Sequence, residues 1–311
     1  MNLFDIKKKH HFVMQNYLKL WKLGVNEGSS KQGVWAYSKE RKTTHFFTDL
    51  DSTAQERYFY ELHIDEDVFG LLYSRYGQYS ECKEALQWLE TLMHIHQYKE
   101  AKEYNHDKLK SININILEEI YAKQESKVSR ILQSIDGDLD IFIDNIINHR
   151  ESPTSLAYIF FFQLFRTKSY RNSLDTHLNK LSISWSDGQS REFSLQQKEN
   201  YLKASAYLET MVSTTRLITS GFSIEFLENN NHKKFITSDT PSIFIDGLNH
   251  QISTMVGYMP LTPNLAMLVR GNSIRKIAIF RKNISQDIVM SYNKHMKNSN
   301  SSYLYSTSKH F

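Results

Sequence analysis

Two polar residues interrupt the most apolar segment of the chain. From Leu156 to Phe165 nearly every residue is apolar, which is typical of a helix buried on all sides, and Gln163 and Arg166 are the polar exceptions. An unpaired buried charge costs several kcal/mol, so Arg166 needs a carboxylate or an anionic ligand. The candidate partners are Glu118, Glu125 and Asp239. The alternatives are a purely structural ion pair, or an arginine whose head reaches water at the helix end.

Glu118 and Glu125 lie seven positions apart in a segment, 114–135, whose apolar spacing predicts a helix. They share one face, about 10 Å apart along the axis, at the edge of the apolar stripe. That separation is too long for the carboxylate pair of a retaining glycosidase, which sits about 5 Å apart. The two groups could still approach one polar pocket, or they form a solvated charged flank.

Asp239 follows a strand-like run, 234–237, and precedes Thr240 and Pro241. An acid held at the end of a strand is well placed to face a cleft. An aspartate in this context can also simply form an Asx-type turn.

His10 and His11 follow the basic run Lys7–Lys9 at the predicted start of the first helix. The apolar face of that helix is marked by Met14, Tyr17, Leu18 and Trp21. Gln15 lies one turn beyond His11, so the two share a face. Imidazole can act as an acid, a base or a metal ligand near neutral pH. The alternative is a histidine pair that merely flanks a helix.

Our first hypothesis is an enzyme in which these distant residues converge. The candidate catalytic residues are His11, Glu118, Glu125, Gln163, Arg166 and Asp239, with His10, Gln15, Thr167 and Thr240 as binding support. Glu118, Glu125 and Asp239 could hold a divalent cation, Mg²⁺ or Mn²⁺. His11 or a carboxylate would activate water, and Arg166 would stabilise a phosphate transition state. This predicts a hydrolase, a metal-dependent nuclease or nucleotide hydrolase acting as a toxin or antiviral effector, with nucleic acid or a nucleotide as its partner.

Two other functions use the same residues. In the second hypothesis the chain is a binding or sensor module that captures an anionic ligand through Arg166 and His11, without chemistry. In the third, Arg166 with Glu118 or Glu125 is a buried network that only fixes helix packing.

The elements that must position these residues are arranged as helices first and sheet last. Two strand-like runs, 34–37 and 43–48, predict an early β-hairpin, and residues 63–111 resemble a polar helical insertion. Helices are predicted over 139–148, from Pro153 onward and over 195–220. Strands are predicted over 223–227, 234–237, 242–245, 254–258, 265–269 and 276–280. This segregation predicts one α+β domain over residues 1–311, with mostly helical N-terminal two-thirds packed on a mainly antiparallel C-terminal sheet.

Composition limits the class of protein. The single cysteine, Cys82, can form neither an internal disulfide nor a zinc ribbon, which indicates a reducing compartment. The start of the chain lacks the apolar run of a signal peptide, and no run approaches the roughly 20 residues that span a bilayer. A net charge of +4 permits phosphate-bearing partners without demanding them. We therefore expect a cytoplasmic protein without a membrane partner.

The ordered set of motifs resembles the domain of unknown function 4238 family of bacterial proteins. The resemblance rests on the residues 9–18, KHHFVMQNYL, on the helix from Leu117 to Glu125, and on three short motifs. These are Gln163-Leu164-Phe165-Arg166-Thr167, Ser238-Asp239-Thr240-Pro241 and Pro260-Leu261-Thr262-Pro263. It spans nearly the whole chain, with 63–111 the least comparable part.

The chain departs from the family pattern at Met14 and Lys168, where the family commonly has proline. Neither departure removes a proposed site residue, although Met14 puts in doubt how rigidly the first helix is entered. The resemblance implies that the polar residues named above form a shared signature. It implies no reaction, because the family has no assigned function.

Overall fold

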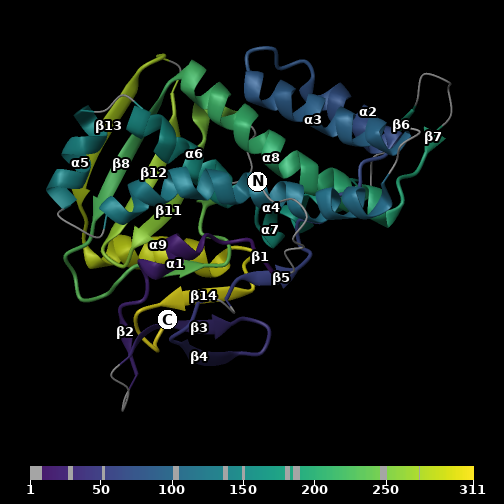
Figure 1. The fold of residues 1–311 in the computed structure, drawn as a ribbon. Coiled ribbons are helices and arrows are strands. Elements are labelled where there is room, and N and C mark those ends of the chain that lie inside the picture. Colours follow the sequence, from purple (N-terminus) through teal and green to yellow (C-terminus); the bar gives the residue numbers. More distant parts are fainter. Residues whose placement is uncertain are drawn as a thin grey trace.

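The computed structural model describes residues 9–26, 31–50, 53–100, 105–135, 139–148, 151–178, 183–184, 190–245, 251–272 and 274–311. Its class is α+β, as predicted, with helices dominating the first two-thirds of the chain and a largely antiparallel sheet after them (Figure 1). Lys7 and Lys8 of the predicted basic run lie outside the described residues.

The helices alternate with short strands early in the chain. They are α1 (Gln15–Lys19), α2 (Glu66–Tyr76), α3 (Lys83–Glu100), α4 (His106–Ser134), α5 (Leu139–Asn148), α6 (Glu151–Phe165), α7 (Lys168–Leu178), α8 (Leu195–Ser220), a 3-10 turn η1 (Ile252–Thr254) and α9 (Gln286–Asn298). The long helix predicted over 195–220 is confirmed as α8. It begins at a capping box, in which Ser194 and Gln197 satisfy each other's backbone N–H groups. In the described part of the chain, no helix combines the length and apolarity needed to cross a bilayer.

The larger sheet has the strand order β10 (Ile243–Phe244), β11 (Val256–Thr262), β12 (Leu265–Gly271), β8 (Phe222–Glu228) and β13 (Ile277–Asn283). All its pairs are antiparallel except β8 with β13. Alternation along a strand sends neighbouring side chains to opposite faces. On β11, Gly257 therefore faces Phe160 of α6, while Tyr258 stacks on Tyr292 of α9.

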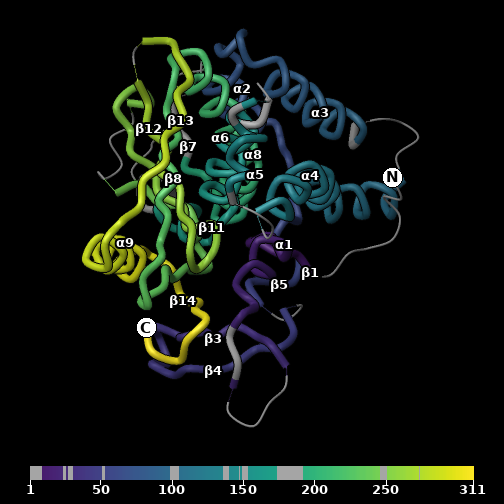
Figure 2. The backbone as a smooth tube through the Cα atoms, turned by 90° about the vertical axis from the view of Figure 1, so that its left-hand side faces the viewer, coloured from purple at the N-terminus to yellow at the C-terminus, as the bar shows by residue number. Residues whose placement is uncertain are grey.

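The two faces of this sheet are covered by different helices. Figure 2 shows α9 on one side of the strands and α5, α6 and α8 on the other. The face of α5 and α6 is packed by aromatic pairs, such as Phe142 with Phe226 and Phe160 with Phe244. From Leu156 to Phe165 the helix α6 is buried except for the half-buried Tyr158, in agreement with its apolar composition.

A second sheet joins the two ends of the chain. It has the order β2 (Gly24–Val25), β3 (Gln32–Ser38), β14 (Tyr303–Ser306) and β9 (Thr237–Ser238), with β4 (Thr43–Phe47) paired to β3. The antiparallel pair β3–β4 confirms the predicted hairpin. Two short pairs complete the strands: β1 (Lys9–His11) with β5 (Gln55–Arg57), and β6 (Ile183–Ser184) with β7 (Ser190–Arg191).

The prediction for the first helix was partly wrong. His10 and His11 lie in strand β1, paired with Glu56 and Gln55, and the helix α1 begins only at Gln15. The apolar spacing from Met14 to Trp21 describes a buried face, but this face ends after a short helix and a turn. The histidines therefore do not enter a helix, because strand pairing with Gln55 and Glu56 determines their backbone.

Candidate functional site

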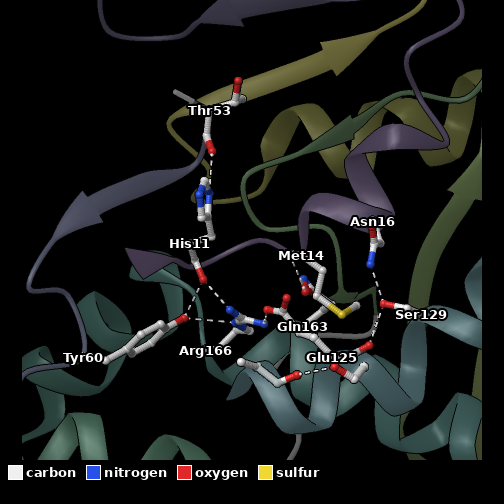
Figure 3. A network of polar contacts seen from close by, with 11 residues as sticks. His11, Met14, Asn16, Thr53, Tyr60, Glu125, Ser129, Gln163 and Arg166 are labelled. Atoms are coloured by element: carbon white, nitrogen blue, oxygen red, sulfur yellow. Dashed lines mark hydrogen bonds and ion pairs between the residues drawn. The ribbon is translucent and has the colours of Figure 1, made fainter. Parts of the chain in front are cut away.

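Arg166 lies just after α6 and is 1% exposed. Its guanidinium donates from Nε to the Tyr60 hydroxyl at 3.0 Å, from Nη1 to Glu125 Oε1 at 2.5 Å, and from Nη2 to the backbone oxygen of His11 (Figure 3). The Tyr60 hydroxyl also donates to that His11 oxygen at 3.0 Å. We call these four residues the Arg166 cluster. It connects β1, the turn after β5, α4 and α6.

Aromatic rings surround the Arg166 guanidinium. The guanidinium carbon, Cζ, lies 4.7 Å from the ring centre of Phe162, 5.0 Å from that of Tyr121 and 5.7 Å from that of Tyr60. Burial lowers the pKa of Arg166, but Tyr60 and Glu125 more than offset this and leave it above its ordinary value. Burial also raises the pKa of Tyr121 to about 12. Arg166 is thus a charged, fully partnered group, and the structural buried ion pair is the interpretation that its contacts favour.

His11 contacts Arg166 through its backbone oxygen rather than its ring, whereas the His10 ring contacts Tyr60. The His11 ring points away from Arg166, with Nδ1 3.3 Å from the Thr53 oxygen and Nε2 3.1 Å from Gln15 Nε2 (Figure 3). His10 is fully buried, accepts a hydrogen bond from the Tyr60 N–H at 2.9 Å and stacks on the Tyr60 ring. The predicted pair of His11 with Gln15 is present, but its geometry does not direct the imidazole at a ligand beside Arg166.

Gln163 and Glu118 lie at the margin of the same cluster. Gln163 accepts the N–H of Met14 through Oε1 at 3.2 Å, and its buried Nε2 has no partner among the described residues. Burial is the main cause that raises the pKa of Tyr60, and the Glu118 carboxylate contributes to the increase. Of the predicted residues, direct contacts bring together His11, Glu125 and Arg166, with Gln15 beside the His11 ring. Gln163 contacts Met14 instead, and Glu118 acts on Tyr60 through its charge.

Asp239 does not join them. Its carboxylate is 5% exposed and accepts the N–H groups of Ser302 and Tyr303 at 3.0 and 3.2 Å, so it fastens the start of β14 beside β9. Burial raises its pKa to about 6, partly opposed by those two hydrogen bonds and by Lys39. The carboxylate is a structural acceptor beside the second sheet.

The predicted metal site does not fit this geometry. Within the described residues, no group of three or more His, Cys, Asp or Glu side chains is placed to hold a metal ion. Glu118, Glu125 and Asp239 therefore do not form a ligand set, because Asp239 is directed to β14 and Glu125 to Arg166. Thr167 and Thr240, predicted as supports, meet instead at a separate cavity.

A cavity that the sequence did not predict opens on the surface near Arg171. It measures about 690 Å³ and lies between the turn after β5, the first turns of α7 and the first turns of α8. Its basic side chains are Arg57, Lys168, Arg171 and Lys203, and its acidic ones are Glu56, Glu61 and Glu199. We call it the Arg171 cavity.

Arg171 differs from Arg166 in its contacts. It is 7% exposed, stacks 3.6 Å from the ring centre of Phe59 and donates from Nη1 to the Phe59 oxygen at 2.9 Å. Its Nε and Nη2 are buried and have no partner among the described residues. Burial lowers the pKa of Arg171 below its ordinary value, since the opposing effects of Tyr60, Tyr121 and the neighbouring glutamates do not offset it fully. The arginine with unused donors is thus Arg171.

The sequence carries only a weak signal for Arg171. It follows Arg166 by five positions and Lys168 by three, in a largely polar segment whose apolar residues, Tyr170, Leu174 and Leu178, are spaced as on one helical face. The burial of Arg171 does not follow from such a pattern.

Comparisons with known proteins place the chain in a family. No curated protein and no solved structure matches it. The family model described as Protein of unknown function (DUF4238) matches residues 9–310, which is nearly the whole chain. These residues include β1, the Arg166 cluster, the Arg171 cavity and the strand β14. The chain belongs to the DUF4238 family.

Proposed function

We propose that the protein binds a small ligand carrying a carboxylate or phosphate group in the Arg171 cavity. The observation that carries this proposal is the pair of buried Arg171 nitrogens, Nε and Nη2, that lack a partner in the described part of the chain. These two atoms lie on one edge of the guanidinium plane. That edge matches two oxygens of a carboxylate or phosphate in a bidentate contact.

The other buried or half-buried cations of the cavity already have carboxylate partners. Lys168 pairs with Glu56, and Lys203 pairs with Glu199 at 2.7 Å while donating to the Glu61 oxygen at 2.9 Å. No ion pair of Arg171 is present among the described residues. The uncompensated buried charge of the cavity therefore belongs to Arg171, and an anionic ligand would remove the cost of leaving it unpaired.

The position of Arg171 is set before any ligand arrives. Stacking on Phe59 and the hydrogen bond to the Phe59 oxygen hold the guanidinium plane. A donor edge that is already oriented loses little side-chain entropy on binding, which favours affinity. Phosphate groups of nucleotides carry the same oxygens, so the nucleotide expected from the sequence remains a ligand of this class.

Hydrolysis at the same cavity is a second candidate function, favoured by His63 and Glu61 in its wall. His63 Nε2 lies 3.0 Å from Glu61 Oε1, and its Nδ1 lies 3.1 Å from Asn113 Nδ2. Because the Asn113 amide donates to Nδ1, the Nε2–H of His63 donates to Glu61, and the Glu61 carboxylate is the group that could act as a general base. Turnover of bis-p-nitrophenyl phosphate by the wild type, with loss in Glu61→Gln, would support it. Binding of phosphate without any turnover would favour the binding function alone.

The binding proposal is tested by thermal unfolding with inorganic phosphate and, separately, malonate. Sodium chloride at equal ionic strength gives the baseline. We expect at least one of the two anions to raise the midpoint of the wild type above that baseline. A ligand at about 100 times its Kd stabilises by about 2.7 kcal/mol. If only phosphate raises the midpoint, the ligand group is a phosphate. If only malonate raises it, the ligand group is a carboxylate.

The matched variants are Arg171→Gln and Arg130→Gln. Arg130 is exposed on α4 and does not line the cavity. We expect the anion-dependent shift to disappear in Arg171→Gln and to persist in Arg130→Gln. The proposal is wrong if neither anion shifts the wild type, or if Arg171→Gln responds as the wild type does.

A further inference from the structure

A second cavity, of about 370 Å³, lies on another side of α7. It is bounded by the first turns of α7, the region of β10 and the end of α9. Thr167 and Thr240, which come from two separate sequence motifs, both line it. It shares no lining residue with the Arg171 cavity. We call it the Ser242 cavity.

The lining of the Ser242 cavity contains no Lys, Arg, Asp or Glu among the described residues. Hydroxyl and amide side chains with the imidazole of His295 form its polar wall, and Phe244 with Ile243 contributes apolar surface. A ligand that carries a full charge would find no carboxylate, ammonium or guanidinium group of opposite sign there. The lining therefore favours a neutral ligand.

Ser242 is fully buried, and its Oγ has no hydrogen-bond partner in the described part of the chain. A buried hydroxyl without a partner costs about 1–3 kcal/mol. Buried polar groups in folded proteins are otherwise almost always satisfied. A ligand in this cavity would supply the missing partner.

The hydroxyls around Ser242 mostly have their protons in use. Ser173 donates to the Tyr170 oxygen at 2.7 Å, Ser299 to the Met296 oxygen at 2.7 Å, and Thr167 to the Leu164 oxygen at 3.0 Å. A hydroxyl that donates to the protein presents its lone pairs to a ligand. Carboxylates and phosphates also present lone pairs, so this wall suits a ligand that brings its own O–H donors.

We propose that the Ser242 cavity binds a small neutral polyol, of the size of a monosaccharide. Its hydroxyl groups donate to the Ser and Thr oxygens of the wall, and one of them pairs with Ser242 Oγ. Its carbon face packs against Phe244. This site is independent of the anion site at Arg171, because the ligand chemistry and the lining residues both differ.

The test uses ligand-observed NMR of the full chain with glycerol, ribose, glucose and myo-inositol at millimolar concentration. We expect saturation transfer to at least one of them. In Ser242→Ala the affinity for that polyol should fall at least about fivefold. The unfolding midpoint without ligand should stay equal or rise, because the variant removes an unsatisfied buried hydroxyl. That second readout separates a ligand-binding serine from a structural one.

Ser126→Ala is the control, because Ser126 is exposed on α4 and makes a comparable hydroxyl bond to the Ala122 oxygen. It should bind the polyol as the wild type does. Thr240→Val, which replaces a hydroxyl by a methyl group of similar shape, is the second variant and should also weaken binding. The proposal fails if none of the four polyols binds, or if both cavity variants bind with wild-type affinity. A fall in the Ser242→Ala midpoint would likewise contradict it.

Discussion

Two arginines only five positions apart occupy opposite chemical situations. Arg166 directs its guanidinium at three oxygen acceptors and has three rings around it. Arg171 has one backbone acceptor, and the edge formed by Nε and Nη2 has none among the described residues. Burial is similar for both, so the difference lies in the partners. Arg166 is explained by packing alone, whereas the unpartnered edge of Arg171 is the basis of the proposed anion site.

The first prediction concerns the Arg166–Glu125 pair. In Glu125→Gln the oxygen acceptor remains, but the buried guanidinium loses its counter-charge. Removing one partner of a buried pair costs about 3–5 kcal/mol, and since the Glu125 side chain is 26% exposed we expect about 3 kcal/mol. Urea unfolding followed by tryptophan fluorescence measures it.

The matched control for this measurement is Glu90→Gln, which makes the same chemical change at an exposed position of α3. It should change the free energy of unfolding by less than about 0.5 kcal/mol. If Glu125→Gln is as stable as the wild type, the Arg166 cluster is not a structural ion pair, and the enzymatic interpretation of these residues regains support.

At the scale of elements, the site depends on how α6 sits against the large sheet. Phe160 of α6 is fully buried, contacts Phe161 and Phe244 edge-on, and lies over Gly257 of β11. The absence of a side chain at Gly257 lets helix and strand approach closely. The Cβ atom of any other residue at position 257 would lie 2.7 Å from Phe160 Cε2, which is closer than a normal contact.

Gly257→Ala should therefore destabilise the protein by about 1–3 kcal/mol, the usual cost of overpacking a dense core. Phe160→Leu removes ring atoms that the new methyl group would meet. We expect the double variant to be more stable than the sum of the single changes predicts, by at least about 0.5 kcal/mol. A double-mutant cycle by urea unfolding tests this. Strict additivity would show that the ring does not limit the approach of α6 to β11.

The helix α7 lies between the Arg171 cavity and the Ser242 cavity. Lys168 and Arg171 line the Arg171 cavity, while Ser169 and Ser173 line the Ser242 cavity. Thr167 caps the start of the helix by accepting the Tyr170 N–H at 3.4 Å, and its hydroxyl donates back to the Leu164 oxygen at the end of α6. The orientation of this one short helix thus sets the polar lining of both proposed sites.

At the scale of the whole molecule, strand β14 joins the chain ends. It pairs with β3 from the N-terminal hairpin on one side and with β9 on the other. Asp239 holds the start of β14 through the N–H groups of Ser302 and Tyr303. The protonation of one buried carboxyl is therefore linked to the closure of the second sheet and to the stability of the whole chain.

This linkage predicts a specific pH dependence. Burial raises the folded pKa of Asp239 from 3.8 to about 6, so the folded state binds the proton more tightly than the unfolded state does. The contribution of Asp239 to the free energy of unfolding therefore grows as pH falls from about 6 to about 4. It is lost as pH rises through 6. Over that window the change is on the order of 3 kcal/mol.

In the variant Asp239→Asn the side chain at position 239 is uncharged at every pH, so it makes no pH-dependent contribution to the free energy of unfolding. The free energy of unfolding of the variant minus that of the wild type should therefore decrease by on the order of 3 kcal/mol between pH 7 and pH 4. Urea unfolding at a series of pH values measures it, with Asp144→Asn, at an exposed position of α5, as the baseline. A difference that stays constant with pH would show that Asp239 titrates normally.

Local patterns in the sequence were enough for the fold class and for most of the long elements. The helices over 114–135, 139–148 and 195–220, the hairpin, and the strands around 223–227 and 265–269 follow from periodicity, which is a property of neighbouring residues. The short strands β1 and β14 did not follow. Pairing with distant segments stabilises them, and strands this short carry no periodic signal of their own.

The need of Arg166 for a partner was also readable from the sequence, because a charge at the end of an all-apolar helix must be compensated. Which partners it has was decided by the tertiary structure. Glu125, Tyr60 and His11 lie 41, 106 and 155 positions away in the chain. The same three-dimensional arrangement sent Asp239 to β14 and left one edge of Arg171 without an acceptor in the described residues. The sequence by itself determined which side chains require partners, whereas only packing between distant elements decided which partners they have, since hydrogen bonds depend on positions in space rather than along the chain.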